Sequence, residues 1–259
     1  MAKLVTVVLL VVPCLVFAGR SALARPAISD DASSMSPVVI VGFVGGFVRP
    51  DDSVHGVVQF AQRLRSELGS TSYIEVVENH RGEKAHQDIL RLLDEQHTGS
   101  PTESEKKQAR IIIYGHSWGG SETVTLAREL EKDGIPVLLT VQIDSISKRG
   151  ENDGIIPANV SRAVNFYQAN GLMHGRSQIR AANPALTKIE NVRFDYTSYA
   201  PNCDLYPWYD RAFMKAHTQM ESDPKVWDRV ESLIRSTIEQ DRVTTATSHA
   251  PSHRILVRQ

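Results

Sequence analysis

The stretch that decides the fold runs from Arg110 to Leu130 and reads RIIIYGHSWGGSETVTLAREL. Its first part, Arg110–Tyr114, is apolar without a break from Ile111 onward, which predicts a strand buried on both faces. Its last part, Thr123–Leu130, has apolar residues on one helical face and predicts an amphipathic helix. The turn between them, GHSWG at 115–119, fits the pattern G-x-S-x-G in the strand–turn–helix context that this motif requires.

Strand and helix patterns alternate on both sides of this stretch. Short runs rich in β-branched residues predict strands at 38–43, 73–77, 110–114, 137–143 and 192–196. Apolar residues at helical spacing predict helices at 54–68, 85–93, 123–130 and 159–170, and one that begins at Pro224. Residues 97–105 are rich in Ser, Thr, Gly and Pro and predict a loop. This alternation predicts the α/β class, with a mostly parallel central sheet and helices on both faces.

Composition excludes several kinds of partner. The chain has 259 residues, with 29 Lys and Arg against 30 Asp and Glu. No segment concentrates the basic residues as a nucleic-acid groove would require, so we expect no nucleic-acid partner. The nine histidines form no H-x-x-x-H or H-E-x-x-H pattern, and Cys14 and Cys203 form no metal-binding pair. We therefore expect no metal and no cofactor.

The first 24 residues have the pattern of a secretory signal peptide. Lys3 is followed by the apolar run Leu4–Ala18, and residues 22–24 (ALA) fit a cleavage site. The run is about 15 residues long, shorter than the roughly 20 that span a bilayer. We expect cleavage after Ala24, secretion or transfer to the periplasm, and no stable membrane anchor afterwards. The mature chain would then hold a single cysteine, Cys203, and no internal disulfide.

The segment GHSWGG resembles the nucleophile elbow of the α/β-hydrolase superfamily, in which this form is common among lipases, esterases and peptidases. The similarity in pattern extends from about Pro37 to about Gln240, although only the elbow is specific. The resemblance implies an α/β-hydrolase domain at 37–241, after a flexible mature N-terminus at 25–36. It leaves room for a small cap or insertion at 145–190, and residues 242–259 read as a mobile tail.

The resemblance implies that Ser117 is the nucleophile and that the acid and the histidine follow it in the chain. Serine needs a base, and histidine has a suitable pKa. We favour His217, in a predicted short loop ahead of the C-terminal helix, where the family places its histidine. The alternatives are His174, His249 and His253.

The acid must lie at the same sheet edge as the nucleophile. We favour Asp144, which directly follows the predicted strand at 137–143. The alternatives are Asp195, Asp204 and Asp210.

An oxyanion hole needs two or more backbone donors, and the N–H of Trp118 is one. The second is expected from the loop VGFVGG at 41–46, which resembles the H-G-G loops of esterases except that Val41 replaces the histidine. That leaves the N–H groups of Phe43 and Val44 as candidates.

Together these residues predict an exported serine hydrolase that cleaves a small-molecule carboxylic ester through an acyl-enzyme. A thioesterase, a peptidase or an acyltransferase on the same fold is the alternative, because specificity resides in pocket shape. A non-catalytic binding protein that has kept the scaffold is a third hypothesis. It predicts that Ser117 does not react with an activated-serine probe.

Overall fold

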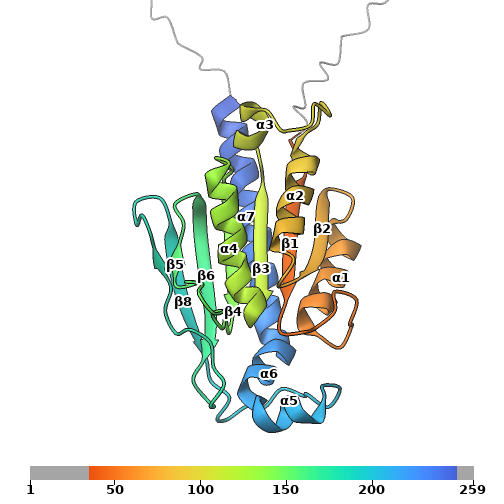
Figure 1. Ribbon diagram of the computed structural model, residues 1–259, viewed down its shortest axis with the longest axis vertical. Coiled ribbons are helices and arrows are strands. Elements are labelled where there is room, and N and C mark those ends of the chain that lie inside the picture. The colour runs from red at the N-terminus through yellow and green to blue at the C-terminus, as the bar shows by residue number, and fades with distance from the viewer. Residues whose placement is uncertain (1–34, 250–259) are drawn as a thin grey trace, which may run out of the picture. The chain divides into compact units, whose positions relative to one another are not determined.

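The computed structural model describes residues 35–249 (Figure 1). The expected signal peptide at 1–24 and nearly all of the N-terminal segment at 25–36 lie outside these residues, as do residues 250–259. Within residues 35–249, every helix lacks the combination of length and hydrophobicity needed to cross a bilayer.

A sheet of six parallel strands forms the centre of the fold, in the order β2-β1-β3-β4-β6-β8. Its strands are β1 (Val38–Val44), β2 (Ser72–Glu78), β3 (Ile111–His116), β4 (Val137–Ile143), β6 (Val160–Gln168) and β8 (Lys188–Phe194). A separate pair of short parallel strands is formed by β5 (Ile155–Ile156) and β7 (Arg180–Ala181).

Helices pack on both faces of the central sheet. They are α1 (Gly56–Leu68), α2 (Gly82–Leu93), α3 (Glu103–Lys107), α4 (Trp118–Lys132), α5 (Trp208–Phe213), α6 (Lys215–Ser222) and α7 (Pro224–His249). The apolar residues of α1 and α7 share one core cluster, and those of α2 and α4 share the other. The predicted α/β class, with a parallel sheet between helices, is therefore confirmed (Figure 1).

The alternation of side chains along β1 shows why both faces need a cover. Val38 and Ile40 belong to the cluster of α1 and α7, whereas Val39, Val41 and Phe43 belong to that of α2 and α4. Successive residues of a strand point to opposite faces, so a strand that is apolar at every position needs a layer of helices on each side.

One predicted helix is wrong. Residues 159–170 were expected to be helical, but Val160–Gln168 is strand β6, paired in parallel with β4 and β8. Spacing alone does not separate a helix face from a strand that is buried on both faces. Here the consecutive residues Ala163 and Val164 pack into opposite core clusters, as they do in a strand. The stretch 145–190, considered as a cap, thus contributes a strand to the central sheet.

Two helical segments besides α6 were expected to be irregular. The predicted loop at 97–105 contains the start of α3, where the Thr102 hydroxyl and the Glu105 carboxylate form a capping box. The tail expected from 242 onward is helical up to His249, because α7 continues to that residue.

The close approach of α4 to β1 gives a stability prediction. A Cβ at Gly119 would collide with the carbonyl oxygen of Phe43 and lie 2.8 Å from that of Val44. Gly119→Ala should therefore destabilise the fold by about 3 kcal/mol, since relief of the clash would need the main chain of β1 or α4 to shift. Urea denaturation measures the effect. Gly171→Ala is the control, because a Cβ there meets Ala216 at an ordinary 3.6 Å. Equal stabilities of the two variants would contradict the prediction.

Candidate active site

Ser117 stands at the junction between β3 and α4 with a strained backbone, φ 58° and ψ −125°. A positive φ is costly for a residue with a side chain and persists only where the surroundings impose it. Here the N–H of Ser117 donates to the carbonyl of Ile143 (3.0 Å), and its own carbonyl accepts from Ile146 (3.1 Å). The turn thus presents Ser117 at the N-terminus of α4, where free N–H groups favour negative charge.

Asp144 lies beside this turn at the end of the neighbouring strand. The register pairs His116 of β3 with Ile143 of β4, so Ser117 and Asp144 are the next residues of two adjacent parallel strands. The Asp144 side chain is fully buried. Its Oδ1 accepts from the N–H of Gly175 (2.7 Å).

The other oxygen of Asp144 faces two further side chains. Its Oδ2 lies 2.8 Å from Gln168 Nε2 and 2.7 Å from His217 Nδ1. Burial raises the pKa of Asp144, but the hydrogen bonds from His217, Gln168 and Gly175 outweigh it, and the net pKa is lowered. Asp144 is therefore a carboxylate at neutral pH.

His217 belongs to α6, not to the loop that was expected. Because ionised Asp144 can only accept, the proton of a neutral His217 belongs on Nδ1, which leaves Nε2 free to act as a base. The His217 ring also packs on the ring of His116, with centroids 4.4 Å apart. Within residues 35–249, the structure gives no hydrogen bond between His217 and the Ser117 hydroxyl.

The loop after β1 contacts Ser117 through a glycine. A Cβ at Gly45 would lie 2.9 Å from the Cβ of Ser117, so only glycine allows this approach. Phe43 and Val44, expected as oxyanion donors, are the last two residues of β1. Trp118 is the first residue of α4 and contacts Phe47 edge to face, with centroids 5.6 Å apart. Gly45 thus lies against Ser117.

Within residues 35–249, none of the alternative acids and bases forms a side-chain hydrogen bond with His217 or Asp144. Asp210, on α5, interacts electrostatically with His217, His55 and Glu221. The exposed Asp195 binds Asn170 and the N–H of Thr197. Asp204 is exposed in the segment before α5, and the His174 ring contacts the carbonyl of Gly175. His249 ends α7, and His253 lies outside the described residues.

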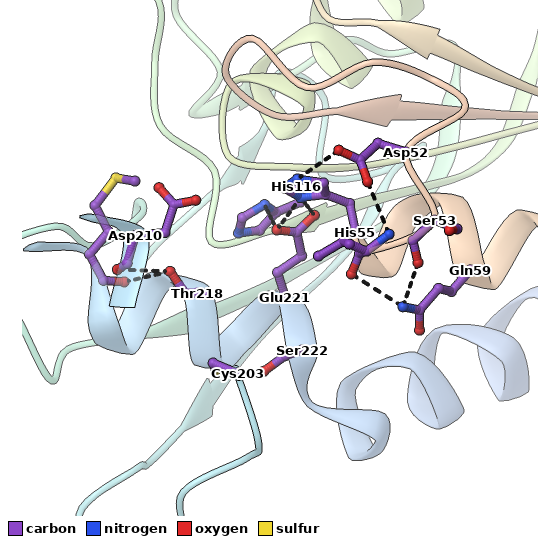
Figure 2. Close-up of polar contacts among 12 residues, drawn as sticks. Asp52, Ser53, His55, Gln59, His116, Cys203, Asp210, Thr218, Glu221 and Ser222 are labelled. Atoms are coloured by element: carbon purple, nitrogen blue, oxygen red, sulfur yellow. Dashed lines mark hydrogen bonds and ion pairs between the residues drawn. The ribbon is translucent and has the colours of Figure 1, made fainter. Parts of the chain in front are cut away.

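Sequence reasoning missed the groups that surround this pair. Gln168 and Gly175 fix Asp144, and a second buried carboxylate, Glu221, lies one helical turn after His217 on α6. Glu221 contacts His55 at 3.1 Å and His116 at 3.6 Å (Figure 2). The spacing of His217 and Glu221, four residues apart, was the available signal, but it becomes one only once the segment is known to be helical.

Buried ionisable groups make the site sensitive to acid. Burial is the main cause that lowers the pKa of His116 to about 4; Glu221 opposes this effect and His217 adds to it. The side chain of an unfolded chain has a pKa of about 6.5. Between these values the unfolded state binds a proton that the folded state does not, so stability falls as the pH falls.

We therefore expect the free energy of unfolding to decrease by about 3 kcal/mol on account of His116 as the pH falls from 6.5 to 4. Urea denaturation at pH 7.5, 6 and 4.5 measures the decrease. The variant His116→Phe keeps an aromatic ring but has no proton to bind, so its stability should depend less on pH. An unchanged pH dependence in this variant would show that other groups control acid unfolding.

Comparisons with known proteins bear on the fold. The chain matches no protein-family model and no curated protein. Among solved structures it is similar to the RedJ thioesterase of the prodiginine pathway in Streptomyces coelicolor, with 12% identity, a TM-score of 0.36, and coverage of 78% of this chain and 100% of that chain.

Two further structures give comparable figures. Arabidopsis thaliana SOBER1 shows 8% identity and a TM-score of 0.36, over 78% of this chain and 99% of that one. The fluorophosphonate-binding serine hydrolase FphF of Staphylococcus aureus shows 12% identity and a TM-score of 0.32, over 77% and 89%. These likenesses are too distant to carry a functional argument. What is confirmed is the fold class, an α/β chain whose parallel central sheet lies between two layers of helices.

Proposed function

We propose that this protein is a serine hydrolase that cleaves a carboxylic ester through an acyl-enzyme. The observation that carries the proposal is the strained Ser117 at the β3–α4 junction, beside the buried hydrogen bond of 2.7 Å between His217 and Asp144. Strained residues cluster at active sites, and Ser117 and Asp144 end adjacent parallel strands while His217 contacts Asp144, which supports a role for the three residues as a triad.

In the proposed reaction the Ser117 oxygen attacks the ester carbonyl while His217 Nε2 accepts the hydroxyl proton. Asp144 holds the ring and stabilises the imidazolium that forms. His217 then gives the proton to the leaving alcohol as the tetrahedral intermediate collapses to the acyl-enzyme. Water, activated by the same ring, releases the acid and restores Ser117.

The negative oxygen of the tetrahedral intermediate would be bound by backbone N–H groups. Trp118 at the first turn of α4 supplies one, and the β1 loop supplies the second. We keep Phe43 and Val44 as candidates and add Gly45, because it lies against Ser117.

A fluorophosphonate probe tests the proposal without knowledge of the substrate. It should label the wild-type protein on the peptide that contains Ser117. The variant His217→Ala should be labelled at least 100-fold more slowly, since the hydroxyl loses its base. Absence of labelling in the folded wild-type protein would favour a non-catalytic binding protein. Release assays with p-nitrophenyl esters, acyl thioesters and aminoacyl anilides then separate esterase, thioesterase and peptidase activity.

We also propose that the enzyme is exported and that its signal peptide is removed after Ala24. The support is the sequence pattern at residues 1–24. N-terminal sequencing of secreted protein should begin at Arg25, and an N-terminus at Met1 would contradict the proposal.

A further inference from the structure

A row of buried polar side chains continues from the proposed base away from Asp144. The ring of His217 packs on that of His116, the Nδ1 of His116 lies 3.6 Å from Glu221 Oε2, and both Glu221 oxygens lie 3.1 Å from His55 Nδ1. All four residues are buried. Figure 2 shows His55 and His116 gathered around the Glu221 carboxylate.

The row joins parts of the chain that are far apart in sequence. His55 immediately precedes α1, His116 ends β3 next to Ser117, and Glu221 shares α6 with His217. His55 is further held by the ring of Tyr206, at a centroid distance of 5.3 Å. The Nε2 atom of His116 has no hydrogen-bond partner within residues 35–249, so the row leaves one polar atom of the ring next to His217 unpaired.

The carboxylate in this row is charged even though it is buried. Burial raises the pKa of Glu221, but its interactions with His116, His55 and His217 outweigh burial and the net pKa is lowered. Burial lowers the pKa of His55, but Glu221, Asp52 and Asp210 raise it by more, so the net pKa is raised. A charged carboxylate that is hydrogen-bonded to His55 thus lies behind a neutral His116.

We propose that Glu221 is a positioning residue for His217, holding the packed His116 ring in place and setting a negative charge behind the base. This inference rests on the proposed function of His217. It adds a group that touches neither substrate nor Ser117. In acyl transfer His217 becomes positively charged, and a carboxylate at short range favours that state in addition to Asp144.

Charged and titratable groups from every neighbouring element enter this balance. His55 and Asp52 precede α1, Asp210 lies on α5 and Asp144 follows β4. His55 acts against Glu221, whereas the three carboxylates act in the same direction as Glu221 on an imidazolium. The effect of Glu221 must therefore be measured against that of His55.

The first test replaces the charge and keeps the shape. Glu221→Gln should lower kcat about tenfold with KM unchanged, because a loosened base loses alignment with Ser117. It should also shift the acidic limb of the pH profile of kcat/KM to lower pH by about half a unit. The reason is that the base loses a nearby negative charge that favours its protonated form. The control is Glu122→Gln, which removes a buried acid on α4 that pairs with Lys148. That variant should keep the pH profile of the wild type.

A second variant predicts the opposite shift. His55→Gln keeps a donor for Glu221 but removes the compensating cation, so the acidic limb should move to higher pH by about half a unit. A structural role alone would not move the limb in opposite directions. The inference is overturned if both variants keep the wild-type limb, or if both shift it the same way. Should Glu221→Gln fail to fold, the direction of the shift in His55→Gln decides.

Fluorophosphonate labelling separates this inference from the proposed function. If wild-type protein labels at Ser117 but the variants leave the pH profile unmoved, Ser117 chemistry stands and the role of Glu221 is wrong. If wild-type protein does not label, the proposed function itself is wrong and the inference falls with it.

Discussion

Replacement of Ser117 by alanine should lower kcat for a carboxylic ester by a factor on the order of 10⁵, because the reaction loses the oxygen that carries the acyl group. KM should change little, since the alanine methyl group fits in the space of the serine side chain. The residual rate would come from the oxyanion donors and from binding alone. The loss is measured by steady-state hydrolysis of a p-nitrophenyl ester, with protein from which contaminating esterases have been removed.

The control for this experiment is Ser66→Ala, on the exposed side of α1, where the hydroxyl contacts the carbonyl of Arg63. Its kcat should equal that of the wild type. Circular dichroism should show that Ser117→Ala is folded, because alanine tolerates φ 58° about as well as serine and the main-chain hydrogen bonds that hold the turn remain. A folded Ser117→Ala variant with wild-type turnover would refute the assignment of the nucleophile.

Asp144→Asn is expected to lower kcat at neutral pH by about 10⁴-fold. The reason lies in the hydrogen bond of 2.7 Å between Asp144 Oδ2 and His217 Nδ1. An amide nitrogen in that position would force the proton onto Nε2, the atom that must accept it from Ser117. The rate should recover in part at high pH, where hydroxide can take the Ser117 proton in place of the ring.

Two measurements keep this result interpretable. A thermal melt shows how much stability is lost, because Gln168 and Gly175 also donate to the Asp144 carboxylate. The comparison variant is Asp195→Asn, which removes the exposed strand-end acid that sequence reasoning left open. It should keep kcat within about twofold. A large loss in Asp195→Asn and none in Asp144→Asn would reassign the acid.

How far the sequence predicts the fold depends on how distinctive each pattern is. The strand at 111–116 is apolar at nearly every position, and only a sheet covered on both faces accommodates it. Residues 160–168 carry polar residues among apolar ones at spacings that suit a helix face, so periodicity favoured the wrong element. The pairing of β6 with β4 on one side and β8 on the other decided the outcome, and no local pattern encodes it.

The site shows the same division between local and distant signals. Ser117 is identified by a turn motif and Asp144 by its place after a strand, and both signals span fewer than ten residues. The network of His55, His116 and Glu221 joins positions up to 166 residues apart. The sequence around a single histidine or glutamate does not indicate which distant residue it will contact, so only the fold reveals the contact.

The main-chain bonds around Ser117 have a consequence for the order of inactivation on heating. Ser117 and Asp144 are tied together through the β3–β4 ladder and the bonds to Ile143 and Ile146, so they separate only when the sheet itself melts. His217 comes from an eight-residue helix outside that ladder. Heat should therefore detach α6 first, and activity should vanish while the sheet still protects its amides from hydrogen exchange. On brief cooling the helix can redock, so early thermal inactivation of this protein should be reversible.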